Sequence, residues 1–325
     1  MEYSRRSFLR TAGAAAATPA LARRALALDY PVRPLRWIVG FPAGGGTDTV
    51  SRIMAQWLSE RLRQSVIVEN KPGASTNISM QAAVAAPADG YTLVCVTASS
   101  AVNVSLFENL PFNLLRDVAP VAGLIDFPLV MVVSPALPVR TVPEFIAYAN
   151  ANPGRISMAS YGTGSTSHLA GELFKVMTGV KMVHVPYRGE APAMTDMIAG
   201  RVQVMFLTLT GSLAHIRSGA VRLIAVCAKT RSEFVPDAPT IADSVPGYEA
   251  NSWCGVGAPR GTPPDIIARL NAEISAGLAD PATRARLATV ATTPIFYTPD
   301  GFSAYIAQEV DKWGKLIRAS GVKME

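Results

Sequence analysis

The chain has 325 residues, of which 49% are hydrophobic and 17% charged, an ordinary composition for a globular protein with a well-filled core. Its length predicts about two domains, because single cores rarely grow beyond roughly 250 residues. The formal charge of +6 would fit a nucleic-acid partner, but five arginines and one glutamate lie in residues 1–27. Without them 25 basic and 23 acidic residues remain, a charge of +2, so we expect no nucleic-acid partner.

The N-terminal segment has the features of an export signal. The stretch Ser4–Arg10 carries two adjacent arginines followed by Phe-Leu and resembles a twin-arginine signal. The alanine-rich apolar run from Thr11 to Leu21 is too short to be a stable membrane anchor. Ala25–Ala27 supplies a small-x-small cleavage site. We therefore expect residues 1–27 to be removed and the remaining chain to be soluble in the periplasm.

Beyond the signal, short apolar runs alternate with amphipathic segments. Strands are predicted, in chain order, at Leu35–Phe41, Ser65–Glu69, Thr92–Val96, Leu129–Val133, Arg155–Ser160, Met182–Val185, Val202–Leu207, Leu223–Ala228 and 251–259. Apolar residues at helical spacing predict helices at Val50–Leu62, Val142–Ala149, Leu169–Met177 and most of Pro263–Ser320. This alternation favours an α/β protein whose largely parallel sheets carry helices on both faces.

Two of the predicted strands lead into a glycine-rich loop that opens a helix. The first loop is Pro42–Asp48 and the second is Tyr161–His168. Glycines let backbone N–H groups approach a ligand, and a helix N-terminus offers unpaired donors, so both units could bind an anion. The alternative is a tight turn without a ligand. Neither loop completes a nucleotide motif, because the first lacks the P-loop lysine and Ser167 replaces the third glycine of G-x-G-x-x-G.

No catalytic or metal-binding set can be assembled from the sequence. His168, His184 and His215 lack the spacing of metal ligands, and no nucleophile, base and orienting residue form a known motif. His168, in the first turn of a predicted helix, could contact a ligand or bond to the backbone. We therefore expect no enzymatic activity, no cofactor and no metal. The widely spaced cysteines predict no disulfide framework: Cys95, Cys227 and Cys254.

A series of motifs together resembles the Bug-type receptors of tripartite tricarboxylate transporters. The motifs are Phe41–Asp48, Val68–Ala74, Pro87–Leu93, Gly162–Phe174, His184–Gly189, Pro192–Asp196, Pro246–Ala250 and Ser252-Trp253. They run in order and at family spacing from about Tyr30 to the C-terminus.

The resemblance implies a type 2 periplasmic binding fold, an α/β architecture of two lobes joined by two crossing strands. It implies lobe one at residues 28–127 and 251–325, and lobe two at residues 128–250. The two glycine loops would face each other and hold one carboxylate with backbone amides, hydroxyls and ordered waters. By position, these contacts fall on Phe41, Ala43, Gly44, Gly45, Thr47, Gly164, Ser165, Thr166, Ser167 and His168.

The resemblance also implies a monomeric periplasmic receptor that captures a small carboxylate by hinge closure and delivers it to membrane permease subunits. The alternative is a periplasmic sensor that presents the same solute to a signalling partner. Amino-acid-binding relatives carry an aspartate after Met-Phe, but here Leu207 follows Met205-Phe206. Because an isolated ammonium group buried against leucine would be costly, we expect Leu207 to select a dicarboxylate, a tricarboxylate or an aromatic acid.

Overall fold

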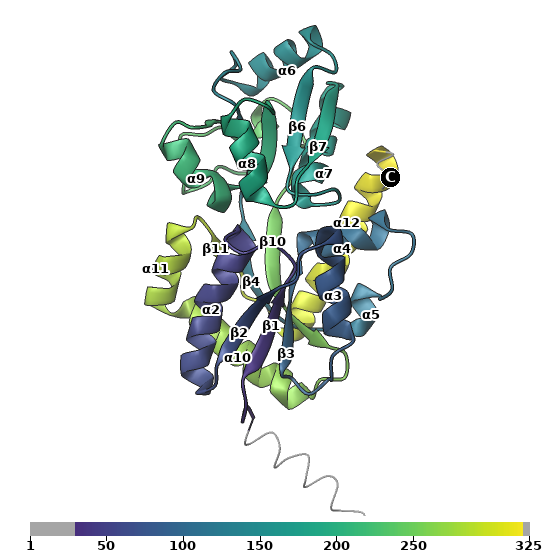
Figure 1. Ribbon diagram of the computed structural model, residues 1–325, viewed down its shortest axis with the longest axis vertical. Coiled ribbons are helices and arrows are strands. Elements are labelled where there is room, and N and C mark those ends of the chain that lie inside the picture. Colours follow the sequence, from purple (N-terminus) through teal and green to yellow (C-terminus); the bar gives the residue numbers. More distant parts are fainter. Residues whose placement is uncertain (1–29, 321–325) are drawn as a thin grey trace, which may run out of the picture.

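The computed structural model describes residues 30–320 and shows two α/β lobes, as predicted (Figure 1). Lobe one is built on a six-stranded sheet in the order β11-β4-β10-β3-β1-β2, and lobe two on a five-stranded sheet in the order β7-β6-β8-β5-β9. The strands of lobe one are β1 (Leu35–Val39), β2 (Val66–Asn70), β3 (Thr92–Thr97), β4 (Val118–Phe127), β10 (Ser252–Pro259) and β11 (Thr293–Pro294). Those of lobe two are β5 (Leu129–Val133), β6 (Ile156–Ser160), β7 (Met182–Pro186), β8 (Val204–Thr208) and β9 (Arg222–Val226).

The strands alternate with helices along most of the chain. The helices of lobe one are α2 (Gly46–Leu62), the short η1 (Ala74–Thr76), α3 (Asn77–Val84), α4 (Ala98–Leu106), α5 (Leu114–Asp117), α10 (Pro264–Ala279), α11 (Pro281–Thr289) and α12 (Pro299–Ser320). Lobe two has α6 (Val142–Ala151), α7 (Thr166–Thr178), α8 (Glu190–Ile198), α9 (Leu209–Arg217) and η2 (Ile241–Asp243). The export signal expected at residues 1–27 lies outside the described residues, and the residue boundaries expected for the lobes stay a prediction.

Both faces of the lobe-one sheet are buried, which explains the nearly continuous apolar runs of its central strands. In β1, Trp37 packs into the core that α2 and α10 cover, whereas its neighbour Ile38 packs with α3, α4 and α12. The pleat sends successive side chains to opposite faces, so one strand serves two cores. The parallel pairs of β1 with β2 and β3 bring the carboxyl ends of these strands to the edge that faces lobe two.

The antiparallel strands β4 and β10 carry the chain between the lobes. They pair from Val118 opposite Pro259 to Phe127 opposite Ser252, so the two crossing points lie side by side. Strand β4 was not predicted from the sequence, because Pro120 and Gly123 interrupt its apolar pattern.

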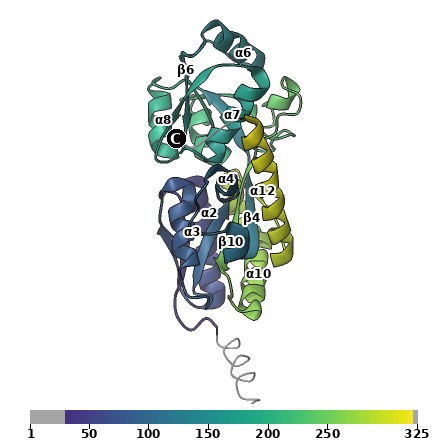
Figure 2. The ribbon, with the colours of Figure 1, turned by 90° about the vertical axis from the view of Figure 1, so that its right-hand side faces the viewer.

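The C-terminal helix α12 adds an apolar contact between the lobes. It packs along α4 of lobe one and reaches α7 of lobe two (Figure 2). Trp313 and Ile317 of α12 are buried together with Val102 and Leu106 of α4 and with Leu169 of α7. Movement of one lobe against the other must therefore bend β4 and β10 and change the packing at Leu169.

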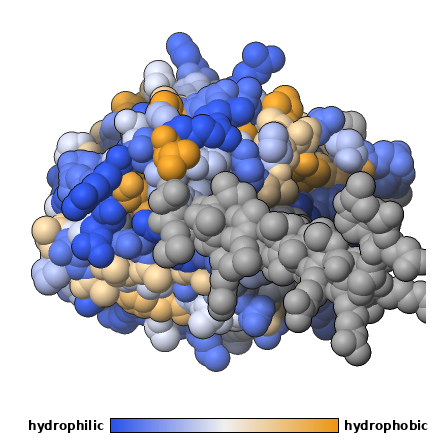
Figure 3. Space-filling view, turned by 90° about the horizontal axis from the view of Figure 1, so that it is seen from below, coloured by the Kyte–Doolittle hydropathy of each residue, from blue (hydrophilic) through white to orange (hydrophobic). Residues whose placement is uncertain are grey.

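The three cysteines among the described residues form no disulfide. Cys95, Cys227 and Cys254 are all buried and unpaired. No helix within residues 30–320 combines the length and apolar character that crossing a membrane requires. Polar residues predominate on the visible part of the face at the lobe-one end, where apolar residues form small separate patches (Figure 3).

The crossing region yields a pH-dependent prediction through Asp126 of β4. Burial, with the charge of nearby Glu309, raises the pKa of Asp126 to about 6, although its hydrogen bond with Asn251 opposes the shift. Because folding raises this pKa above the ordinary value of 3.8, the native state favours the protonated form. Its contribution to stability is thus full below pH about 4 and is lost as the pH rises through about 6.

We predict that Asp126→Asn stabilises the protein at pH 7.5 by on the order of 2 kcal/mol and has little effect at pH 4. Urea unfolding of both proteins across this pH range measures the difference. The exposed Asp237→Asn in lobe two serves as the control. A stability difference that does not change between pH 4 and 7.5 would refute the shifted titration.

Candidate functional site

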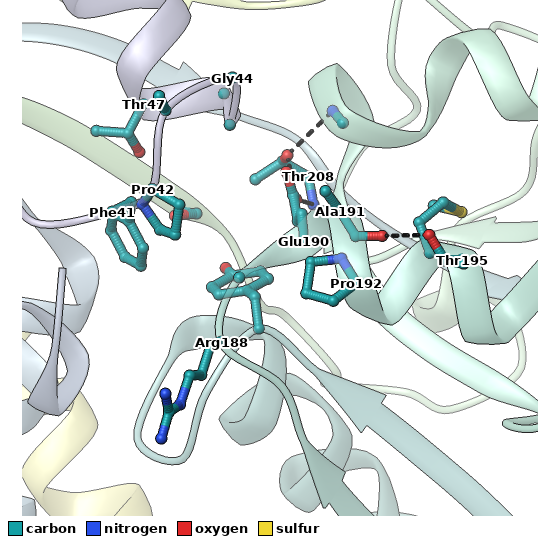
Figure 4. Close-up of a pocket in the computed structure, with 18 of the residues that line it drawn as sticks. Phe41, Pro42, Gly44, Thr47, Arg188, Glu190, Ala191, Pro192, Thr195 and Thr208 are labelled. Atoms are coloured by element: carbon teal, nitrogen blue, oxygen red, sulfur yellow. Dashed lines mark hydrogen bonds between the residues drawn. The ribbon is translucent and has the colours of Figure 1, made fainter. Parts of the chain in front are cut away.

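A cavity of about 370 Å³ lies between the two lobes. Lobe one lines it with residues 41–47, Thr97, Ser99 and Ser252. Lobe two lines it with Tyr161, residues 188–192, Met194, Thr195, Ile198, Thr208, Gly211 and His215. In Figure 4 the first glycine loop, with Phe41, Pro42, Gly44 and Thr47, faces Glu190, Ala191, Pro192 and Thr208 across the cavity. The cavity therefore lies where a ligand would contact both lobes at once.

The first glycine loop is held in place by the buried carboxylate of Asp48. Its oxygens accept hydrogen bonds from the Gly44 N–H at 2.9 Å, from Nε of Arg52 at 2.9 Å and from Nδ2 of Asn70 at 2.9 Å. The same Asn70 amide group donates to the Phe41 carbonyl, so both ends of the loop are fixed. Burial alone would raise the pKa of Asp48, but these hydrogen bonds outweigh it and lower the pKa below its ordinary value.

The loop leaves the start of α2 open towards the cavity. Gly44 has a φ of 84°, a conformation that favours glycine, and the N-cap residue Gly45 has no side chain to cap the helix. The first N–H groups of a helix have no partner inside it, and they attract anions. Phe41, Ala43, Gly44, Gly45 and Thr47, five predicted contacts, all line the cavity here.

Lobe two brings two further helix starts to the same cavity. Helix α8 begins at Glu190 after Gly189, which provides no side-chain cap, and α9 begins after Thr208, whose hydroxyl accepts from the Gly211 N–H. Both starts follow strands of the lobe-two sheet, β7 and β8. Three helix N-termini thus converge on the cavity and favour negative charge there.

The acidic side chain of Glu190 also lies in this region. Oε1 of Glu190 accepts hydrogen bonds from the Thr208 hydroxyl at 2.7 Å and the Thr208 N–H at 3.3 Å. The Gly46 N–H, at the start of α2 in lobe one, also donates to this carboxyl group. Burial raises the pKa of Glu190 above its ordinary value, while the hydrogen bonds from Thr208 and Gly46 act in the opposite direction. Glu190 therefore joins the starts of α9 and α2 across the lobes.

Of the second glycine loop, Tyr161 lines the cavity, whereas residues 162–168 do not. Tyr161 lines the cavity, contacts Phe41 edge to face, and hydrogen-bonds to the Thr166 hydroxyl. Gly164 packs near Leu106 and Asn103 of lobe one. The remaining residues predicted to bind ligand are buried and do not line the cavity: Ser165, Thr166, Ser167 and His168. Their contact with a ligand stays a prediction.

Buried His168 and half-buried His184 of lobe two bond to their own surroundings. Nδ1 of His168 accepts from the Gly164 N–H at 3.2 Å, which is the backbone role considered for this residue. Its ring stacks on His184 with centroids 3.9 Å apart. Burial, and then the charge of His168, lower the pKa of His184 to about 4, so His184 is neutral at pH 7. Within residues 30–320 no group of three or more His, Cys, Asp or Glu side chains is placed to hold a metal ion.

Leu207 is buried in the lobe-two core, where it packs with Val130 and Met194. The next residue along β8, Thr208, lines the cavity instead. The selective role expected for Leu207 stays a prediction. The carboxyl group of Glu190 at the cavity was not predicted from the sequence. A sequence signal for Glu190 existed, because residues 182–198 form a third unit of strand, glycine-containing loop and helix.

Two α/β lobes, joined by two strands around an interlobe cavity, are the architecture of a two-lobed solute-binding protein. The sequence model of the tripartite tricarboxylate transporter family receptor matches residues 50–322, and the chain belongs to this family. A twin-arginine translocation signal matches residues 2–22. The protein is thus an exported periplasmic solute-binding receptor rather than an enzyme.

Individual relatives agree with this assignment. Protein BugT of Bordetella pertussis is 38% identical over 312 residues, which cover 95% of this chain and 96% of BugT. An R. palustris protein solved with adipate is 34% identical with a TM-score of 0.88, covering 90% of this chain and 99% of that one. MatC from Rhodopseudomonas palustris, solved with bound malate, is 29% identical with a TM-score of 0.84, covering 89% and 100%. The Bug-type resemblance is confirmed.

The Glu190 contacts generate a prediction for Gly211. A Cβ atom at this position would overlap with Oε2 of Glu190, while the backbone of Gly211 lies outside the left-handed region. Gly211→Ala should therefore destabilise the protein by about 1–3 kcal/mol, through the displaced carboxyl group alone. Chemical unfolding of the variant measures this loss.

A double-mutant cycle provides the control. In a Glu190→Ala background the overlap is absent, so Gly211→Ala should cost less than about 0.5 kcal/mol. An equal loss of stability in both backgrounds would show that the cost of Gly211→Ala does not come from overlap with Glu190.

Proposed function

We propose that this receptor captures a small organic acid in the interlobe cavity, with a carboxylate of the ligand at the first glycine loop. The observation that carries the proposal is the start of α2, where the N-cap residue Gly45 provides no side-chain cap and the first turn opens into a cavity bounded by the other lobe. Free N–H groups at a helix start are suited to a carboxylate. The adipate and malate in the two R. palustris proteins support an acid as ligand.

Capture by hinge closure follows from how the cavity is divided. Its walls come from both lobes, so a ligand gains all of its contacts only when the lobes are closed. Binding would therefore shift the open and closed populations. The side-by-side crossing points of β4 and β10 provide the place where this motion bends the chain.

The ligand class proposed from the sequence is a dicarboxylate, a tricarboxylate or an aromatic acid. A thermal-shift screen of the chain lacking residues 1–27 tests it, because a specific ligand stabilises the folded state by mass action. We expect acids of these classes to raise the Tm in a concentration-dependent manner. A Tm raised by sugars or polyamines, and by no organic acid, would contradict the proposal.

We propose that the receptor acts as a monomer and delivers the captured acid to the membrane permease subunits of a tripartite tricarboxylate transporter. The family match supports this partnership. A sensor that presents the acid to a signalling partner would use the same cleft. Disruption of the gene separates these roles, since a transport receptor loses uptake of the acid and a sensor loses a transcriptional response.

Thr47 provides a direct test of the carboxylate position. Its hydroxyl lies at the second residue of α2 and lines the cavity, so Thr47→Val removes a donor from the proposed carboxylate. Loss of a hydrogen bond to a charged group costs about 1.5–3 kcal/mol, so calorimetry should show affinity for the acid lowered at least about tenfold.

Thr195→Val is the matched control, because Thr195 also lines the cavity but its hydroxyl donates to the Ala191 carbonyl of its own helix. Its affinity should stay within about threefold of the original protein. Equal losses in the two variants would contradict a carboxylate at the start of α2.

A further inference from the structure

We propose that Glu190 is a specificity-determining residue, whose carboxylate disfavours a second negative charge on the ligand and so selects acids with a single carboxylate. This inference rests on the proposed function and narrows its ligand class, because it disfavours the dicarboxylates and tricarboxylates and leaves acids with one carboxylate, such as an aromatic monocarboxylic acid. It starts from the position of Glu190, which lies in the cavity wall and is bonded to Thr208 of lobe two and Gly46 of lobe one.

The local geometry is built around this carboxyl group. Thr208 donates to Oε1 through both its hydroxyl and its N–H, and Gly211 lacks the Cβ atom that would overlap with Oε2. Burial favours the neutral form of this group, whereas the donors at the starts of α2 and α9 favour the ionised form. When ionised, Glu190 partly cancels the positive field of the converging helix starts, which leaves less of it for the ligand.

The rest of the cavity offers little to a second carboxylate. Among the described residues that line it, the ionisable side chains are those of Tyr161, Arg188, Glu190 and His215. Arg188 is exposed, and Figure 4 shows its guanidinium group extending away from the other labelled residues. The wall next to Glu190 is largely apolar, with Ala191, Pro192, Met194 and Ile198. A second carboxylate would lose water here without gaining a cation, and it would meet the charge of Glu190.

Three ligands of equal length test the inference: hexanoate, adipate and 6-aminohexanoate. Each has a carboxylate for the first glycine loop, and their far ends are neutral, negative and positive. Calorimetry at pH 7.5 compares the full mature chain with Glu190→Gln, which has nearly the same shape without the charge. Glu233→Gln, an exposed glutamate of lobe two outside the cavity, is the control.

The expected result is a change that follows the charge of the ligand. In Glu190→Gln, affinity for adipate should rise about tenfold relative to hexanoate, and affinity for 6-aminohexanoate should fall by a similar factor. Glu233→Gln should leave these ratios unchanged. Thermal unfolding of the variants establishes that each is folded.

Other outcomes overturn the inference in different ways. Unchanged ratios in Glu190→Gln would show that the ligand does not meet a charge at this position. An equal loss for all three acids would assign Glu190 a purely structural role. If the original protein and Glu190→Gln bind none of the three acids, while the thermal-shift screen finds another acid, only this inference fails. If no acid of any class binds, the proposed function fails with it.

Discussion

Asp48 holds the first glycine loop at one end of the cavity, and the geometry of the site depends on it. This buried carboxylate accepts from Gly44, Arg52 and Asn70, and it thereby sets the path of the first glycine loop. Because Asp48 accepts from the Gly44 N–H and Glu190 from the Gly46 N–H, the donors proposed for a ligand are those further along the first turn of α2. The surrounding sheet delivers this start to the interlobe edge, since β1 ends directly before the loop.

The cavity is a balance of like and unlike charges rather than a simple positive pocket. Helices α2, α8 and α9 all begin at it, and their N-terminal dipoles attract anions. The carboxyl group of Glu190 opposes this field and accepts hydrogen bonds from Thr208 of lobe two and Gly46 of lobe one. When Glu190 is ionised, a ligand carboxylate meets a second negative charge in this cavity, and we propose that the charge of the ligand is therefore a means of selection, as well as its shape.

Much of the fold could be predicted from the sequence because local patterns encode it. Buried residues form apolar runs in β1, β3, β5 and β8 and recur at helical spacing in α2 and α10. Both patterns can be recognised in the sequence alone. Strand β4 could not be found this way, because Pro120 and Gly123 interrupt its apolar pattern and its pairing with β10 is a contact distant in sequence. The apolar contact of α12 with Leu169 is likewise a tertiary feature.

The site could be predicted only in part. The first glycine loop carries its own signal, and its residues line the cavity. The second loop has the same signal, yet Gly164 is buried beside Asn103 and Leu106, and of this loop only Tyr161 lines the cavity. Glu190 was not predicted, because the strand, glycine-containing loop and helix of residues 182–198 place a helix start at the cavity but do not show which side chain faces it. Its importance arises from two donors, Thr208 and Gly46, that are far from it in sequence.

A crystal structure of the mature receptor, with an organic acid found by screening, tests the central claim most directly. The account predicts the acid between the lobes, with one carboxylate oxygen within hydrogen-bonding distance of N–H groups in the first turn of α2. An acid bound outside the cleft, or bound in the cleft with its carboxylates away from α2, would contradict it.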